Sequence, residues 1–142
     1  MKRICVIDGQ GGGIGSAIIK QLKEVFVEKV EIIALGTNAI ATAQMLKAKA
    51  NRGASGENAV VQTVPGASVI IGPVGIIIAH AMMGEVTPKM AEAVAKSPAK
   101  KLLLPVSQEK VDIVGTVPTP LPHLIESLIQ NNLKNFLNEQ HQ

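Results

Sequence analysis

Apolar residues lie along this chain in short runs that alternate with longer amphipathic stretches. A nearly continuous apolar run is typical of a strand covered on both faces of its sheet, and four such runs occur, at residues 2–8, 30–35, 68–71 and 101–104. Between the runs, apolar residues recur at the 3.6-residue period of a helix, most clearly at Ile14, Ala17, Ile18, Leu22, Val25 and Phe26. Strands alternating with helices predict a doubly wound α/β fold with a mostly parallel sheet.

The same patterns place the helices and the last strand. Helices are expected over residues 14–27, 38–50, 57–64, 76–83 and 87–96, and a last one carries apolar residues from Leu121 to Leu137. A fifth strand is expected at 111–114. A parallel crossover needs a dozen residues or more, and only residues 105–110 precede this strand, so we expect it to be antiparallel. The prediction is a single Rossmann-like domain over residues 1–142 with strand order 3-2-1-4-5 and a ligand crevice between the carboxyl ends of strands one and three.

The first predicted strand runs directly into a cluster of glycines, and a helix follows. Glycines let a chain turn tightly and let a ligand approach the backbone, and the N-terminus of the following helix favours an anion. The loop therefore predicts a site for a nucleotide, a dinucleotide such as NAD(P), or another phosphorylated ligand. The alternative is a tight turn that binds nothing. The residues of this candidate site are Asp8, Gly9, Gln10, Gly11, Gly12, Gly13, Ile14 and Gly15.

The spacing of these glycines departs from the strict G-x-G-x-x-G pattern. Gly9, Gly13 and Gly15 give G-x-x-x-G-I-G, which resembles the cofactor loop of short-chain dehydrogenases. That family needs a catalytic tyrosine, and this chain has none, so its chemistry is excluded.

The second predicted strand lacks the acid that binds a ribose in NAD sites. It ends in Gly36, Thr37 and Asn38. Thr37 and Asn38 are candidates for hydrogen bonds to a ribose or a 2′-phosphate, or Asn38 only caps the next helix. The choice between NAD and NADP stays open.

Other polar or flexible points fall near the expected crevice. The third strand ends at Gly72, Pro73, Val74 and Gly75, either a turn or a place where backbone meets ligand. Asp8 either receives a ligand group or holds the glycine loop through its backbone N–H groups. His80 is a candidate general base or a structural histidine. Catalytic residues stay unassigned.

Composition narrows the classes of partner. The chain has two phenylalanines and no tryptophan or tyrosine, and its lysines are scattered despite a net charge of +3, which argues against nucleic-acid binding. The single cysteine, Cys5, lies in a strand, and no metal-ligand spacing occurs, so we expect neither a disulfide nor a metal. The apolar stretch 67–83 is broken by Pro73 and glycines and is short for a membrane span. We expect a cytoplasmic protein.

Four segments resemble a bacterial Rossmann-like family known as domain of unknown function 3842. They are residues 6–15, 55–59, 71–76 and 84–88, and the resemblance covers nearly the whole chain. It implies a small stand-alone Rossmann-like protein and carries no catalytic residues across. It also draws attention to the polar loop Ser55 to Asn58 as a second point for an anion.

Three functions are compatible with these patterns. The first is a module that binds a nucleotide or other phosphorylated ligand in a sensing or regulatory role. The second is a small enzyme acting on such a ligand, with Asp8, His80 or Glu85 in acid–base roles. The third is a partner-binding protein with a vestigial loop. An exposed apolar patch from Val74 to Met83, used by a partner or by a second copy, would favour the third function. Because the chain is so apolar, a homo-oligomer is expected under each function.

Overall fold

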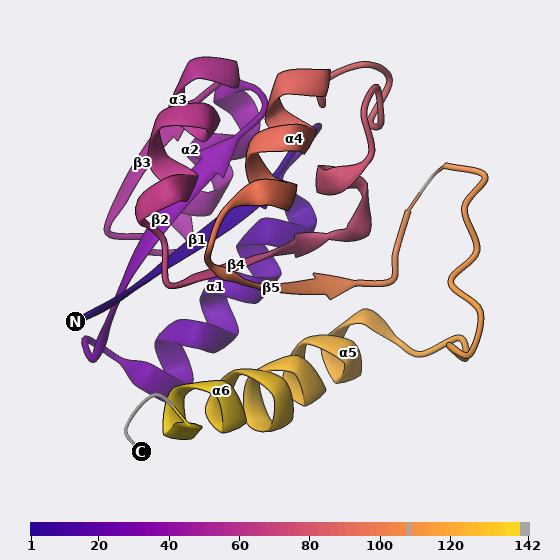
Figure 1. The fold of residues 1–142 in the computed structure, drawn as a ribbon. Coiled ribbons are helices and arrows are strands. Elements are labelled where there is room, and N and C mark those ends of the chain that lie inside the picture. Colours follow the sequence, from indigo (N-terminus) through magenta and orange to yellow (C-terminus); the bar gives the residue numbers. More distant parts are fainter. Residues whose placement is uncertain (108, 140–142) are drawn as a thin grey trace.

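The computed structural model describes residues 1–107 and 109–139 (Figure 1). Its elements confirm the predicted α/β alternation. In chain order they are β1 (Lys2–Asp8), α1 (Gly13–Phe26), β2 (Val30–Gly36), α2 (Ala39–Lys47), β3 (Arg52–Ser55), α3 (Glu57–Thr63), η1 (Val64–Gly66), β4 (Val69–Pro73), η2 (Val74–Ile77), α4 (Pro88–Lys96), β5 (Lys100–Leu104), α5 (Leu121–Ser127), η3 (Leu128–Leu133) and α6 (Lys134–Glu139). The last three form one continuous helix with a π turn at η3.

The described residues form one five-stranded sheet in the order β3-β2-β1-β4-β5, which confirms the predicted order 3-2-1-4-5. Every pairing is parallel. The prediction of an antiparallel last strand was wrong. The segment predicted as that strand, 111–114, joins no strand, and the last strand of the sheet is β5, which was predicted at 101–104. Residues 74–99 precede β5 and include α4, so the chain has ample length to cross over and run parallel to β4.

Two segments differ from the prediction: one strand forms that was not expected, and one expected strand does not form. Residues 52–55 were expected to break the chain, but they form β3, because the open edge of β2 supplies parallel hydrogen-bonding partners. Gly53 fits there because a Cβ at this position would lie 2.9 Å from Thr42 Cγ2 of α2. The predicted strand 111–114 belongs to no strand; it lies in an exposed irregular segment after β5, where Val114 is 96% exposed.

The helix predicted over 76–83 was also wrong. The segment makes a short 3₁₀ turn, η2, and then a series of tight turns. His80, Met82, Met83 and Gly84 all have positive φ, between 57° and 90°. A right-handed helix excludes such angles, and non-glycine residues adopt them at a cost that the surrounding structure must offset. The periodicity of small apolar residues gave no sign of this turn.

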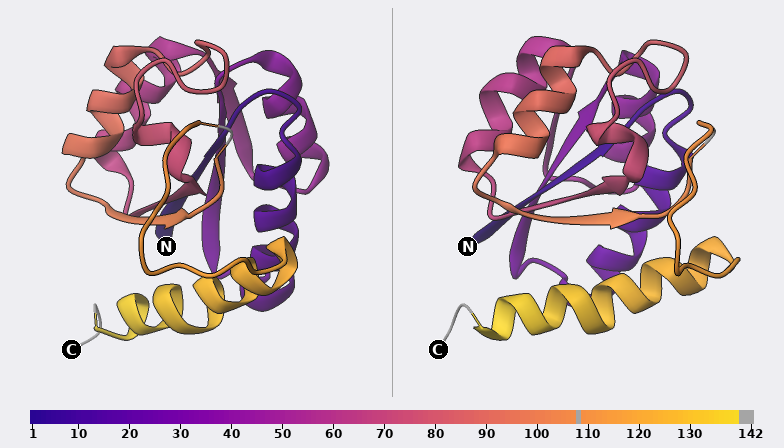
Figure 2. Two further views of the ribbon diagram at one scale, coloured as in Figure 1. Left: turned by 90° about the vertical axis from the view of Figure 1, so that its right-hand side faces the viewer. Right: turned by 45° about the vertical axis from the view of Figure 1, so that its right-hand side comes forward.

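Alternate residues of the central strands pack into two cores, one on each face of the sheet. On β1, Ile4 and Val6 face the core formed with α1, α2 and the last helix, while Cys5 and Ile7 face the core formed with α3 and α4. Figure 2 shows α1 and the last helix on one side of the sheet and α4 on the other. Both faces are therefore covered, as the continuous apolar runs predicted. No helix within the described ranges combines the length and the apolar character that crossing a bilayer requires.

Candidate functional site

The glycine loop is fixed by the side chain at the carboxyl end of β1. Asp8 is 4% exposed; its Oδ1 accepts the N–H of Gly9 at 2.8 Å and its Oδ2 accepts the N–H of Gly15 at 2.7 Å. Gly12, the N-cap residue of α1, has no side chain, so Asp8 satisfies the first turn in its place. Of the two roles predicted for Asp8, these hydrogen bonds correspond to the second, holding the loop.

Burial raises the pKa of Asp8, and the N–H groups of Gly15, Gly9 and Ile14 lower it by less, so the net shift is upward. The negative charge of Glu85 adds a further small increase. The carboxylate is therefore held in a poorly solvated place, where its hydrogen bonds to the backbone partly offset the lost hydration.

Three of the loop glycines are required by the fold itself. A Cβ on Gly12 would lie 2.8 Å from backbone atoms of Ala41, and its φ is +75°. A Cβ on Gly15 would lie 2.5 Å from Met45 Sδ, and one on Gly9 would collide with Thr37 Oγ1. These glycines let α1, α2 and the ends of β1 and β2 approach closely.

Gly11 and Gly13 differ from these three. Both are exposed, neither has a positive φ, and a Cβ on either would meet no atom within 4 Å. No hydrogen bond joins the N–H of either residue to another residue of the described ranges. Packing therefore does not explain why these two positions lack side chains, and their donors remain available at the N-terminus of α1.

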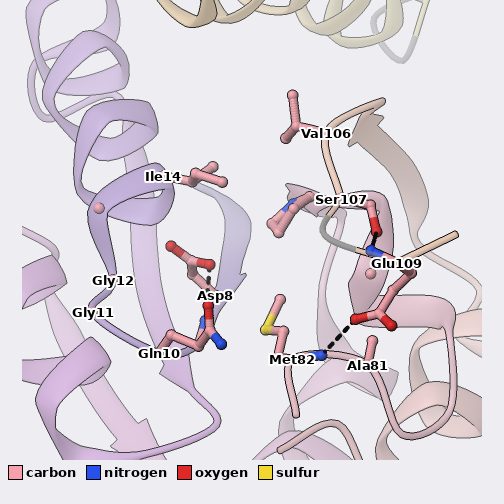
Figure 3. Close-up of a pocket in the computed structure, with 14 residues that line it drawn as sticks. Asp8, Gln10, Gly11, Gly12, Ile14, Ala81, Met82, Val106, Ser107 and Glu109 are labelled. Carbon is pink, nitrogen blue, oxygen red and sulfur yellow. Dashed lines mark hydrogen bonds between the residues drawn. The ribbon is translucent and has the colours of Figure 1, made fainter. Parts of the chain in front are cut away.

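The loop opens on a cavity of about 380 Å³ at the carboxyl ends of β1, β4 and β5. Figure 3 shows Asp8, Gln10 and Ile14 on one side of it and Met82, Ser107 and Glu109 on the other. Its described lining comes from the glycine loop, the end of β4, the tight turn before α4, and the segment after β5: Asp8, Gly9, Gln10, Gly11, Gly12, Gly13, Ile14, Pro73, Gly75, Ala81, Met82, Val106, Ser107 and Glu109. No lysine or arginine occurs among these residues.

Glu109 joins the two segments that form the wall opposite the glycine loop. Its Oε1 accepts the N–H of Met82 at 2.9 Å, and its own N–H donates to Ser107 Oγ at 2.9 Å (Figure 3). Met82 has a φ of 58°, so the strained turn presents its N–H to this carboxylate. Backbone strain beside a cavity is a feature of many binding sites.

A second carboxylate, Glu85, holds the turn after β2 against the glycine loop. Its Oε1 accepts three hydrogen bonds, from the N–H of Gln10 at 2.8 Å, from Thr37 Oγ1 at 2.6 Å and from Asn38 Nδ2 at 2.9 Å. Burial raises the pKa of Glu85, but these donors together lower it by more, so the net shift is downward. The ionised form of Glu85 therefore stabilises this junction.

Replacing Glu85 with glutamine is expected to cost stability near neutral pH and progressively less in acid. Because the folded-state pKa is lowered, the carboxylate contributes stability that is fully present above its ordinary pKa of 4.5 and is lost as pH falls through the lowered value. The raised pKa of Asp8 has the opposite sign, since its contribution falls as pH rises from 3.8 toward the raised value. Urea denaturation of the wild type and Glu85→Gln at pH 7 and at decreasing pH measures the difference.

Glu24→Gln provides the control for this comparison, because Glu24 is an exposed carboxylate on α1. Its free energy of unfolding should track the wild type across the same range. If Glu85→Gln lowered the free energy of unfolding by the same amount at every pH tested, the charge of Glu85 would not stabilise this junction.

The family model described as a domain of unknown function, number 3842, matches residues 3–137. The chain belongs to this family. No curated protein and no solved structure matches it.

In this member of the domain of unknown function 3842 family, the structure brings together part of the predicted site. The loop residues from Asp8 to Ile14 line the cavity, and so do Pro73 and Gly75. Gly15 lies behind the loop, bonded to Asp8. Gly72 packs against the carbonyl of Ile7, and neither Gly72 nor Val74 is part of the described lining.

Thr37 and Asn38 are turned toward the protein and away from the cavity. Thr37 donates to Glu85, and Asn38 donates to Glu85 and to the carbonyl of Gln10. Asn38 Oδ1 also accepts the N–H of Ala41 at 2.8 Å, which is the N-cap role that the sequence offered as an alternative. Both side chains thus bind the protein at the positions where a dinucleotide site would present them to a ribose.

The remaining candidates lie outside the cavity. His80 is exposed on the tight turn and is not part of the described lining. In the loop from Ser55 to Asn58, Ser55 Oγ is 2.7 Å from Thr42 Oγ1, and Glu57 accepts a hydrogen bond from Thr87 at 2.6 Å. These contacts join β3 to α2 and α3 to the start of α4. No group of histidine, cysteine, aspartate or glutamate within residues 1–107 and 109–139 is arranged to hold a metal ion.

Sequence reasoning missed the wall formed by Ala81, Met82, Val106, Ser107 and Glu109. Residues 105–110 had been interpreted as a hairpin turn and 76–83 as a helix. One signal was present: Val106 to Glu109 follow the carboxyl end of an apolar strand, the edge where α/β sheets bind ligands.

Proposed function

We propose that this chain binds a nucleotide or another phosphorylated ligand in the cavity beside the glycine loop. The observation that carries the proposal is the contrast among the glycines. Packing explains why Gly9, Gly12 and Gly15 lack side chains. Gly11 and Gly13, by contrast, are exposed and have open space where a Cβ would stand, and their N–H groups bind no other described residue. A ligand that approaches the backbone gives these two positions a physical reason to lack side chains.

The position of the cavity supports the same proposal. In the strand order β3-β2-β1-β4-β5, the chain connections reverse direction between β1 and β4, and open α/β sheets bind ligands at such a switch point. The N-terminus of the 14-residue helix α1 lies there, so its partial positive charge and free donors favour an anionic group. Because no cationic side chain occurs in the described lining, the backbone would supply the attraction for a phosphate.

The segment after β5 favours a sensing or regulatory role for the bound ligand. Glu109 connects this segment to the turn at Met82 across one wall of the cavity. Beyond it, Val111, Ile113, Val114 and Val117 are exposed. A ligand in the cavity would act directly on the Glu109–Met82 contact, and thereby on an apolar surface able to contact a partner.

A thermal-shift screen of the purified protein tests the proposal. NAD, NADP, ATP, GTP, AMP, CoA, FAD and inorganic phosphate are compared at equal concentration. A ligand present at about 100 times its Kd adds roughly 2.7 kcal/mol of stability, which is several degrees for a domain of this size. A shift that Gly13→Asp removes supports the site, and the absence of any shift across the panel contradicts the proposal.

We also propose that copies of this chain associate through the segment that follows β4. Met83 is 92% exposed and Ile77 is 39% exposed there. Sedimentation velocity of the wild type and of Met83→Lys measures the oligomeric state. A monomeric wild type contradicts this part of the proposal.

A further inference from the structure

We infer that the site takes a nucleoside monophosphate, with the phosphate at Gly11 and Gly13 and the sugar hydroxyls at Glu109, and that it excludes dinucleotides. This inference rests on the proposed function and makes it more specific. It follows from which side of the glycine loop is open, which side is closed, and where a free acceptor lies.

The cavity lies entirely on the β4 and β5 side of the loop. It includes no residue of the loops directly after β2 or β3; its described lining is residues 8–14, Pro73, Gly75, Ala81, Met82, Val106, Ser107 and Glu109. A dinucleotide lies across the switch point, with one half over each side of the sheet. The described cavity lies over one half, and its volume of about 380 Å³ is near the lower end of the ~300–1,000 Å³ range of ligand sites.

The β2 side is closed by side chains in direct contact with the loop. Thr37 and Glu85 both crowd the α-carbon of Gly9, since a Cβ there would collide with Thr37 Oγ1 and lie 2.9 Å from Glu85 Oε1. Glu85 bonds to both Thr37 and Asn38, as well as to the loop N–H of Gln10. The groups expected to bind the ribose of a dinucleotide are thus occupied by an acid from the protein itself.

On the open side, Glu109 supplies an acceptor for hydroxyl groups. Its Oε1 binds the N–H of Met82, while its Oε2 forms no hydrogen bond with another described residue. A carboxylate accepts strong hydrogen bonds from sugar hydroxyls. Ile14, Met82 and Val106 supply apolar contact surface around the same space, suited to a flat ring (Figure 3). A phosphate at one end, hydroxyls at the other and an apolar wall together match a nucleoside monophosphate.

Isothermal titration calorimetry of the full chain tests this inference. The probes are AMP, GMP, CMP and UMP, the 2′,3′-dideoxy form of whichever binds best, NAD and NADP. We expect at least one monophosphate to bind ten times or more tighter than NAD. In Glu109→Gln, the affinity for the ribonucleotide should fall about tenfold, because a charge-assisted hydrogen bond is lost, and the affinity for the dideoxy form should stay unchanged.

Two comparisons separate the possible failures. Glu109→Gln keeps an acceptor for Met82, and Asp112→Asn, an exposed acid in the same segment, is the matched control. Equal loss of ribonucleotide and dideoxynucleotide affinity in Glu109→Gln shows a structural role for Glu109 and overturns its assignment. NAD binding as tightly as the best monophosphate, with that binding abolished by Gly13→Asp, overturns the size limit alone. Binding of no probe overturns the monophosphate inference, and the wider thermal-shift panel then decides the proposed function. Binding that Gly13→Asp leaves unchanged overturns the placement of the site at this loop, and the proposed function with it.

Discussion

Replacing Gly13 with aspartate is expected to abolish nucleotide binding and to leave the fold intact. A Cβ at this exposed position meets no atom within 4 Å, so a side chain leaves the backbone without a clash. An acid in the first turn of a helix also stabilises it, by roughly 0.3–1 kcal/mol. The same carboxylate stands beside the N–H groups that would bind the phosphate. Two like charges about 4 Å apart repel by ~1–4 kcal/mol near a protein surface, and the side chain fills the space that the ligand needs.

Calorimetry with the best nucleotide and urea denaturation, performed on the same preparations, measure both effects. Binding should weaken by about a hundredfold or more, while the free energy of unfolding stays equal or rises. Gly13→Asn separates size from charge, because it fills the same space without repelling the phosphate and should bind better than Gly13→Asp. Unchanged nucleotide binding in Gly13→Asp would falsify the placement of the site at this loop.

Replacing Gly12, one residue earlier, with alanine is expected to destabilise the fold, which Gly13→Asp leaves intact. The φ of Gly12 is +75°, and a Cβ there would lie 2.8 Å from the Cα and the carbonyl oxygen of Ala41. A left-handed non-glycine residue costs about 1–3 kcal/mol, and overpacking against backbone costs a similar amount. The protein should lose about 2–4 kcal/mol of stability, because α1 and α2 must move apart.

The matched control is Gly13→Ala, which differs only in position and has open space for its methyl group. Alanine there should not destabilise the protein and can add up to ~1 kcal/mol, since it restricts the unfolded chain. The midpoints of urea denaturation measure both variants. If Gly12→Ala were as stable as Gly13→Ala, the close approach of α1 to α2 at this glycine would not exist in solution.

The pattern of apolar and polar residues was sufficient to predict the class of fold. Residues such as Ile4, Cys5, Val6 and Ile7 are apolar without alternation, and only a sheet covered on both faces buries all of them. Helical periodicity placed α1 to within a residue at each end, and α4 begins at the expected position, where Thr87 caps the helix and Pro88 takes its first turn. The glycine loop between the first strand and the first helix followed from the same pattern.

The sequence patterns could not predict which distant segments pair in the sheet. Arg52 to Ser55 has no strand pattern of its own, and it becomes β3 because the edge of β2 accepts its backbone and α2 leaves room at Gly53. Val111 to Val114 has a better strand pattern and pairs with no strand of the sheet. Sheet membership depends on available hydrogen-bonding edges, which are properties of the assembled fold.

The sequence by itself determined that a strand, a glycine loop and a helix follow one another at the start of an α/β protein of this family. Only the tertiary structure decided which groups line the cavity beside that loop. It directed Thr37 and Asn38 inward to Glu85, 47 or 48 positions away along the chain, and placed Glu109 across the cavity from Gln10. The physical reason is that local patterns fix backbone conformation over a few residues, whereas a site is formed by side chains that long-range packing brings together.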